Sequence, residues 1–479
     1  MLSTNKYFDY SLSPHQQKAF DLILEFIANP SAEIFILKGY AGTGKTTLMS
    51  GLIKYFIEIK MKYSLLATTG RAAKILSNKT NTKANTIHGH IYVFNDLSDD
   101  LEHMSGLQNN LEVDDKGQIS LVFGLRSFVS ESEKIYIIDE ASMVSDIIDK
   151  NSSFAQFGSG NLLDDILNFD NKGKFIFIGD PCQLPPIGQV NSPALDENYI
   201  KSKYNKKVSS FELTEIVRQK DSNGIIEASN KIRSSFKINP KVKFAQLNLK
   251  GHKNIIFHSS HINLLNDYIT RLNSDGLHNC TLICQTNKHC SDLNKIIRNS
   301  LHGKSEKVAI GELLLVTQNN YVSNLVNGDQ VIIKNIGPKE FRCGISFLQV
   351  EVQELVSEKL HNLLLLEDIL YTQQTNLNNK QHKDLMIDFF KRMQAKSIQQ
   401  KDKKFKENML SDPYLNALKC VYGYAITCHK SQGGEWDEVY LYLDNKIHGL
   451  PKPSIYQWWY TAITRAKNNL HIVNDWFIK

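Results

Sequence analysis

The sequence predicts an α/β fold with two parallel sheets, each in its own domain. Short apolar runs that end in small or acidic residues recur in the first half of the chain, at 34–37, 64–68, 135–139 and 175–180. Runs of this kind, alternating with helical stretches, are typical of buried parallel strands. A second series predicts a second sheet, whose strands resume after a long interruption. Its members lie at 281–284, 424–427, 439–443 and 470–473.

Length and composition agree with a large globular chain. The 479 residues suggest about three domains, and 42% apolar with 22% charged residues exclude wholesale disorder. The formal net charge of +6 fits a nucleic-acid partner without establishing one. The seven cysteines follow no disulfide or zinc pattern, and no signal peptide or membrane span is evident. We therefore expect a cytoplasmic protein with free thiols.

The first strand is followed by a phosphate-binding loop, which reads GYAGTGKTT over 39–47. It matches G-x4-G-K-[ST] in the required place, a strand-to-helix turn. Glycines let the backbone wrap around phosphate oxygens, while the helix that follows presents free N–H groups. Lys45 would reach the β and γ phosphates of ATP, and the Thr46 hydroxyl would hold Mg²⁺. The nucleotide-binding residues predicted in this loop are Gly42, Thr43, Gly44, Lys45, Thr46 and Thr47.

Two further strand ends carry groups suited to ATP hydrolysis. Asp139 and Glu140 close the strand at 135–138, where Asp139 can hold Mg²⁺ and Glu140 can take a proton from the attacking water. In the segment GDPCQLPP, Gln183 is placed as a polar sensor that contacts both the water and the γ phosphate. The alternatives are a solvated strand end and a plain loop. These residues by themselves indicate an ATPase and no more.

The order of the motifs is more informative than any single motif. In addition to the segments above, the chain contains LSPHQ (12–16), ATTGRAAK (67–74), NTIHG (85–89), LTEIVRQ (213–219), YAITCHKSQGGEWDEV (424–439) and YTAITRAK (460–467). The set resembles the helicase motifs of superfamily 1, in particular the 1B branch that includes RecD-like enzymes and the phage helicase Dda. This resemblance implies two RecA-like P-loop domains and an ATP-dependent DNA helicase that travels 5′ to 3′ in repair, recombination or replication.

The resemblance also assigns roles by position. It implies that Gln16 reads the adenine edge, and that Arg218 and Arg465 reach the γ phosphate from across a cleft. Glu435 would contact the nucleotide sugar. Two fixed guanidinium groups would stabilise charge on the transferring phosphoryl group, although each arginine could instead form an ordinary surface ion pair. The residues that match the DNA-contacting loops of the family are Thr69, Arg71, Thr86, His88, Thr427, His429, Lys430, Ser431 and Gln432.

The resemblance divides the chain into two RecA-like domains, each with an insert. The predicted ranges are 1–88 with 134–220 for the first domain, 89–133 for a pin subdomain, 221–337 with 421–479 for the second domain, and 338–420 for an SH3-like insert with a basic helical extension. A hairpin within 107–125, turning at 115–117, is the candidate wedge. Its residues Val122 and Phe123 could stack at a duplex fork or pack inside the subdomain.

The positive charge is concentrated in one segment of the second insert. Residues 380–407, which we expect to form a polar helix, hold nine Lys or Arg against four Asp or Glu and so contribute +5 of the +6. A solvated helix face is the ordinary interpretation of such a segment. An auxiliary contact with duplex DNA or a protein partner is the alternative.

Three functions compete at this point. The first is a helicase that acts on single-stranded DNA and on junctions between single- and double-stranded DNA, working as a monomer. The second is a translocase on single-stranded DNA or RNA that remodels protein–nucleic acid complexes. The third, a scaffold that binds nucleotide without turnover, has no need of a general base and two arginines, so the intact Glu140, Arg218 and Arg465 speak against it.

Overall fold

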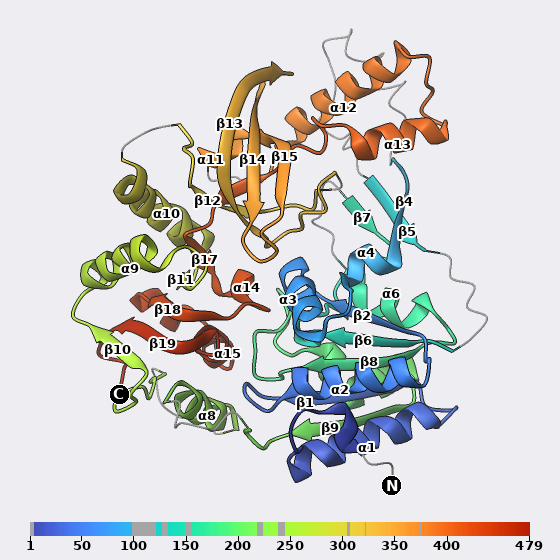
Figure 1. Cartoon of the computed structure of the whole chain (residues 1–479), viewed down its shortest axis with the longest axis vertical. Coiled ribbons are helices and arrows are strands. Elements are labelled where there is room, and N and C mark those ends of the chain that lie inside the picture. Colours follow the sequence, from blue (N-terminus) through green and yellow to red (C-terminus); the bar gives the residue numbers. More distant parts are fainter. Residues whose placement is uncertain are drawn as a thin grey trace.

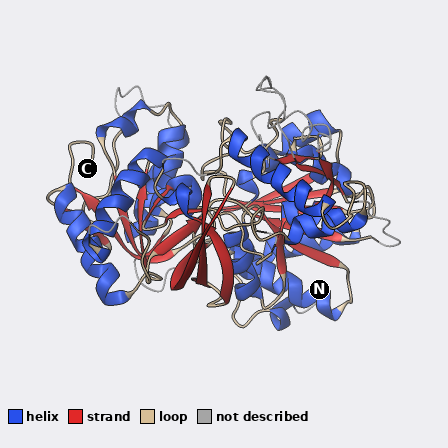
Figure 2. Ribbon diagram, turned by 90° about the horizontal axis from the view of Figure 1, so that it is seen from above, coloured by secondary structure: helices blue, strands red, loops and turns tan. Residues whose placement is uncertain are grey.

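The computed structural model describes residues 4–97, 121–126, 133–148, 155–217, 224–237, 245–303, 307–320, 322–372 and 376–479. Two domains built on parallel sheets lie side by side, and a third, antiparallel sheet stands beside the second domain (Figure 1). Figure 2 shows helices on both sides of the strands in each domain. No helix in these ranges has the length and apolarity needed to cross a membrane.

The first domain contains a six-stranded sheet in the order β3-β2-β6-β8-β1-β9, with every pair parallel. The strands are β1 (Ile34–Gly39), β2 (Tyr63–Ala67), β3 (Ala84–Thr86), β6 (Ile135–Asp139), β8 (Lys174–Gly179) and β9 (Val208–Leu213). The helices of this domain are α1 (Pro14–Ala28), α2 (Lys45–Glu58), α3 (Gly70–Thr80), α4 (Ile87–Ile91), α6 (Leu162–Phe169) and α7 (Glu197–Tyr204). All four strands predicted in this half are confirmed. Their runs are apolar throughout because α1 and α2 cover one face of the sheet while α6 and α7 cover the other.

The second domain contains a five-stranded parallel sheet in the order β10-β19-β18-β11-β17. The strands are β10 (Ile255–His258), β11 (Cys280–Cys284), β17 (Ala425–Thr427), β18 (Trp436–Tyr442) and β19 (Ala466–Val473). The helices of this domain are α8 (Gly224–Lys237), α9 (His261–Asp275), α10 (Asn287–His302), α14 (Cys428–Ser431) and α15 (Ser454–Ile463). The second predicted series of strands, with its long interruption, is therefore confirmed.

The interruption contains an antiparallel five-stranded sheet in the order β15-β14-β13-β12-β16. Its strands are β12 (Leu313–Val316), β13 (Gln330–Arg342), β14 (Ile345–Glu354), β15 (Leu360–Leu366) and β16 (Cys420–Tyr422), and α11 (Glu367–Leu370) follows β15. The domain boundary predicted at residue 338 falls inside β13. The sheet begins at Leu313, because β12 pairs with β13 on one side and β16 on the other.

The prediction of one polar helix over 380–407 is wrong. The chain forms two helices there, α12 (Asn379–Gln394) and α13 (Lys403–Ser411), separated by residues 395–402. They share a buried core, to which α12 contributes Phe389, Phe390 and Met393 and α13 contributes Phe405 and Met409. A polar stripe alone would not hold two short helices together, so this apolar face explains why the segment folds back on itself.

A three-stranded sheet joins β4 (Tyr92–Leu97), β5 (Leu121–Leu125) and β7 (Ala155–Phe157). The pin subdomain predicted at 89–133 therefore also includes β7, which lies in the range predicted for the first domain. The hairpin turn predicted at 115–117 lies outside the described residues. Phe123 is buried and stacks on Phe157 with ring centroids 4.8 Å apart, so it packs inside the subdomain. The α12–α13 pair docks on this sheet, as Phe94 packs against its core and Lys406 Nζ donates a hydrogen bond to the Asn95 carbonyl (Figure 1).

Candidate active site and nucleic-acid interface

A cleft of about 690 Å³ lies between the two parallel-sheet domains. The first domain lines it with the phosphate-binding loop, the end of β6 and Gln183, while the second domain contributes Gly433, Glu435, Thr464 and Arg465. In the first domain the loops that follow the carboxyl ends of β1, β6 and β8 reach the cleft, which is where open α/β sheets bind their ligands. The residues of the second domain directly precede β18 and β19. The structure thus brings together residues separated by more than 400 positions in the sequence.

The phosphate-binding loop has the backbone that its glycines predict. Gly42 and Gly44 have φ angles of 80° and 85°, in the left-handed region, and α2 begins directly after Gly44. A Cβ on Gly44 would lie 2.2 Å from Gln16 Nε2, so any side chain there would displace Gln16 as well as strain the backbone. Lys45 Nζ donates to the carbonyl oxygens of Gly39 and Tyr40, at 2.6 and 3.1 Å. The lysine is thereby held against the loop. A bound phosphate would replace those carbonyls as the hydrogen-bond acceptor of its ammonium group.

Gln16 is buried against the phosphate-binding loop. Its Oε1 accepts a hydrogen bond from Ser13 N at 3.1 Å, which completes the capping box of α1, and its Nε2 donates to the Thr43 carbonyl at 3.1 Å. An amide oxygen has two acceptor positions and an amide nitrogen two hydrogens. One of each remains for an adenine edge, so the predicted role is compatible with this arrangement.

The end of β6 places Asp139 beside Glu140, whose backbone is left-handed with φ 52°. Removal from water and the charge of Glu140 raise the pKa of Asp139 to about 7, whereas the Lys45 ammonium lowers it. Burial likewise raises the pKa of Asp180, whose Oδ2 accepts from the Tyr460 hydroxyl at 2.7 Å. Asp139 and Thr46, at the start of α2, line the same cleft, and a carboxylate with a hydroxyl suits a bound Mg²⁺.

Gln183 has one polar atom without a protein partner. Its side chain is 4% exposed, its backbone N–H donates to the Asp180 carbonyl at 3.2 Å, and its Oε1 is buried without a hydrogen bond from any described residue. Such an orphan acceptor is costly unless a ligand satisfies it. Its position on the cleft fits the predicted contact with an attacking water.

Arg465 of the second domain lines the cleft, and three hydrogen bonds hold its guanidinium in place. The residue is 4% exposed, and its guanidinium donates to the Thr461 carbonyl at 3.0 Å, the Gly434 carbonyl at 3.1 Å and the Thr464 hydroxyl at 3.3 Å. Glu435 also lines the cleft, with Oε2 3.4 Å from Lys79 Nζ of the first domain.

Arg218 lies outside the described residues. Its neighbour Val217 lines the cleft, and the Val217 N–H donates to the Gly42 carbonyl at 3.1 Å.

Three threonines predicted to contact a strand are helix N-caps. The hydroxyls of Thr69, Thr86 and Thr427 accept hydrogen bonds from the backbone N–H three residues later, at 3.1 to 3.4 Å. They begin α3, α4 and α14. Each hydroxyl therefore has a local structural role, and the free N–H groups of each first turn are left pointing out of the helix end.

Three other residues predicted at the strand-binding surface are packed inside the protein. Arg71 donates from Nη1 to Gln330 Oε1 at 2.5 Å, and its guanidinium lies 4.2 Å from the centre of the Trp436 ring. Burial lowers the pKa of Arg71 to about 10. Ser431 is fully buried, and Gln432 Nε2 donates across the domain interface to the Leu184 carbonyl at 3.0 Å. The Arg71 and Gln432 side chains join the two domains, whereas Ser431 Oγ donates to the Cys428 carbonyl at 2.8 Å within α14.

The remaining predicted contacts, His88, His429 and Lys430, are partly exposed. His88 lies against the Tyr92 and Phe157 rings, and burial lowers its pKa to about 4. Burial also lowers the pKa of His429 and of Lys430. Both histidines are thus expected to be neutral hydrogen-bonding groups near pH 7.

Residue-by-residue reasoning on the sequence missed two residues of α15 that face the first domain. The Tyr460 hydroxyl accepts from Ala41 N in the phosphate-binding loop at 3.0 Å while it donates to Asp180. Thr461 Oγ1 accepts from Leu184 N at 2.8 Å. The signal was present, because both residues stand in the YTAITRAK segment that supplies Arg465.

The fold and the cleft define a P-loop protein whose phosphate-binding loop faces a second parallel-sheet domain. Residues 11–245 match the AAA domain model, and residues 422–473 match the UvrD-like helicase C-terminal domain model. The two matches follow each other along the chain, and the second model names a helicase domain, which agrees with the resemblance of the motifs to helicases.

Several curated proteins are similar over most of the chain. The uncharacterized protein R530 of Acanthamoeba polyphaga mimivirus is 24% identical over 95% of this chain and 98% of its own length. The RecBCD enzyme subunit RecD of Buchnera aphidicola is 24% identical over 98% of this chain and 75% of its own length. The ATP-dependent DNA helicase Pif1 of Campylobacter jejuni is 24% identical over 90% and 86%.

Among solved structures, Pif1 helicase from Bacteroides in complex with ADP-AlF3 and single-stranded DNA aligns with a TM-score of 0.49. The alignment has 16% identity and covers 98% of this chain and 94% of that chain.

Proposed function

We propose that the protein is an ATP-dependent DNA helicase that moves along single-stranded DNA and unwinds duplexes at junctions. One observation carries the proposal: Arg465 of the second domain and the phosphate-binding loop of the first line the same cleft. A nucleotide bound there would contact both domains. Its hydrolysis would then change how the domains are held together, which is what a motor requires.

Each residue of the cleft has a proposed role in ATP binding or hydrolysis. The loop amides and Lys45 would bind the β and γ phosphates. Gln16 would bind the base, and Glu435 would contact the sugar. Glu140 would accept a proton from the attacking water, which Gln183 orients, and Arg465 would stabilise charge on the transferring phosphoryl group. Mg²⁺, which would neutralise phosphate charge, would be held by Thr46 and Asp139. Arg218 is assigned to the same group through the family resemblance.

A short path links this site to the strand-binding loops. The backbone of Leu184, next to the sensor Gln183, is bound on its N–H by Thr461 and on its carbonyl by Gln432. Gln432 ends the segment 427–432, which begins at the cap of α14. A change at the γ phosphate that moves the sensor loop would therefore be felt at α14, where the second domain is proposed to grip a strand.

The proposed ligand is a single strand whose phosphates are bound without regard to sequence. Helix N-termini capped by Thr69, Thr86 and Thr427, together with His429 and Lys430, offer backbone N–H groups and polar side chains that suit phosphate oxygens. The 5′ to 3′ direction follows from the 1B resemblance. A monomeric motor and a role at DNA forks belong to the same proposal.

The decisive experiment is unwinding of partial duplexes that carry either a 5′ or a 3′ single-stranded tail. We expect ATP-dependent unwinding of the 5′-tailed DNA only, and none with the Glu140→Gln variant, which keeps the fold. Unwinding of 3′-tailed substrates would refute the direction. DNA-stimulated ATP turnover with no unwinding, but with displacement of a protein block from the strand, would favour the translocase instead. No nucleotide turnover at all would refute the enzyme assignment.

A further inference from the structure

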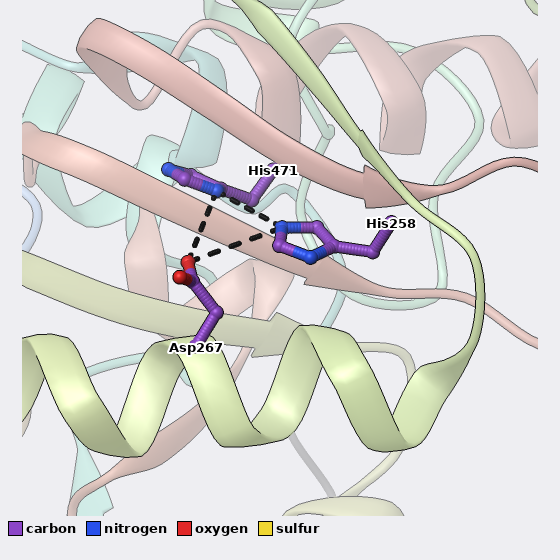
Figure 3. A group of neighbouring side chains, drawn as sticks. All are labelled: His258, Asp267 and His471. Carbon is purple, nitrogen blue, oxygen red and sulfur yellow. Dashed lines mark hydrogen bonds and ion pairs between the residues drawn. The ribbon is translucent and has the colours of Figure 1, made fainter.

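Two histidines and an aspartate meet on the second domain, outside the nucleotide cleft and the strand-binding loops. His258 ends β10, the edge strand of the sheet, and His471 lies on the neighbouring strand β19. Ile256 pairs with His471, so His258, two residues further along, projects on the same face. Asp267 comes from α9, which packs over that face, and the three side chains point toward one another (Figure 3).

The three side chains are spaced as metal ligands are. His258 Nε2 lies 3.1 Å from His471 Nδ1, while Asp267 Oδ2 lies 3.5 Å from His471 Nδ1 and 4.0 Å from His258 Nε2. Ligand atoms bound to tetrahedral zinc at its usual bond lengths are roughly 3.3 Å apart. One ion placed between the three atoms would therefore satisfy all of them with small adjustments of Asp267.

A second ring of hydrogen bonds orients two of these ligands. His471 Nε2 lies 2.7 Å from Glu438 Oε2, which fixes the ring hydrogen at Nε2 and leaves the Nδ1 lone pair directed at His258 and Asp267. Glu438 is itself held by Asn469 Nδ2 at 2.8 Å, and the Tyr440 hydroxyl donates to Asp267 Oδ2 at 2.7 Å. Carboxylate–histidine–metal arrangements of this kind are usual around zinc.

The chemistry of the donors selects the class of metal. Two imidazole nitrogens with one carboxylate oxygen suit zinc and its transition-metal neighbours, whereas Mg²⁺ and Ca²⁺ prefer oxygen donors alone. The Asp267 side chain is 46% exposed and that of His258 12%, while that of His471 is 3% exposed. The cluster is therefore open to solvent on the aspartate side, which gives an ion a way in and a water the fourth position.

From this geometry we propose that His258, Asp267 and His471 form a zinc-class metal site distinct from the magnesium site of the ATPase. A bound ion would tie edge strand β10 and helix α9 to β19. Because β10 pairs with β19 alone, this clamp would stabilise the outer edge of the second domain. The competing arrangement is a metal-free one, in which His258 Nε2–H donates a hydrogen bond to His471 Nδ1 over the same 3.1 Å.

The test is metal titration of the full chain after removal of metal with a chelator. Zn²⁺ is titrated into one sample and Co²⁺, as a spectroscopic probe, into another. Both samples contain Mg²⁺ and ADP to occupy the cleft. All proteins carry Cys343→Ser, since Cys343 is the exposed thiol of the chain. We expect one equivalent of tightly bound metal, tetrahedral Co²⁺ absorption without thiolate charge-transfer bands, and a rise of several degrees in the unfolding midpoint.

The variants separate the metal site from the hydrogen-bonded pair. Asp267→Asn keeps the shape and the Tyr440 contact, and it should weaken metal binding at least tenfold while ATP turnover is unchanged. His258→Gln should do the same, and Glu438→Gln should weaken binding and shift the Co²⁺ bands. His289→Asn is the matched control, because His289 forms a histidine–aspartate pair with Asp444 elsewhere in the domain, at 3.4 Å. Equal binding by wild type, Asp267→Asn and His258→Gln, or no binding by wild type, would overturn the proposal.

Discussion

Replacement of Arg465 by alanine should leave nucleotide binding largely intact and remove most of the turnover. The arginine has five N–H donors, and three of them are committed to Thr461, Gly434 and Thr464. The other two donors have no hydrogen bond to a described residue, and Arg465 lines the cleft. Loss of one well-placed donor to a developing charge costs roughly 3 kcal/mol, a factor of about 10² to 10³ in kcat. We therefore expect DNA-stimulated kcat to fall by at least about 100-fold.

The assay pairs steady-state ATP turnover at saturating DNA with equilibrium binding of a fluorescent ATP analogue. Arg465→Lys keeps the charge but not the fork of donors, so it should recover only part of the rate. Lys467→Ala is the matched control: it removes a nearby positive charge whose ion pair with Asp437 is solvent-exposed, and it should turn over normally. If Arg465→Ala kept a kcat within threefold of wild type while folded, the arginine would not act on the transferring phosphate.

Three further outcomes are expected. Lys45→Ala should abolish measurable ATP turnover without changing the circular dichroism spectrum, and turnover at the wild-type rate would refute the loop assignment. Gln432→Ala removes the hydrogen bond to Leu184, so stimulation of ATP turnover by DNA should drop severalfold while turnover without DNA is retained; unchanged stimulation would contradict the proposed path. His88 has a pKa of about 4 in the folded protein against 6.5 when unfolded, so below pH 6.5 the unfolded state binds more protons and stability falls as the pH drops. Between pH 7.5 and 5 this costs about 1 to 2 kcal/mol, and thermal unfolding of His88→Gln should show a smaller loss over that range; an identical loss would show that His88 is not responsible.

Eight of the eleven strands of the two parallel sheets could be predicted from the sequence because they are largely buried on two faces, whereas β3, β9 and β10 are more exposed and were not predicted. A run such as FIFIG at 175–179 has no polar face, and that pattern arises from packing against helices on both sides. The third sheet was harder to delimit. The run LLLV at 313–316 looks like another parallel strand, yet it pairs antiparallel with β13 and β16, and apolarity does not reveal the direction of the partner.

The prediction of a single polar helix over 380–407 was wrong because it was based on the charge of the segment and not on the spacing of its apolar residues. Phe389, Phe390 and Met393 recur at helical spacing among the lysines, and these residues form the core shared with α13.

The active-site residues within one motif could be predicted, while those that depend on the meeting of two domains could not. The glycines and Lys45 are set by a local strand-to-helix turn. The burial of Arg71 between Gln330 and Trp436, by contrast, depends on three distant segments coming together. The same holds for His258, Asp267 and His471, which are up to 213 residues apart and share no motif.

The spacing of the contact residues at the carboxyl end of α15 constrains the length of this segment. Tyr460 and Thr461 bind the phosphate-binding and sensor loops near the carboxyl end of α15. Arg465 follows just beyond the end of the helix, where its Nε donates to the Thr461 carbonyl at 3.0 Å. These side chains come from one short segment, so they face the first domain together. Inserting or deleting a single residue between positions 461 and 465 would move the guanidinium away from the Thr461 carbonyl that orients it. Length in this segment should therefore be held far more strictly than composition.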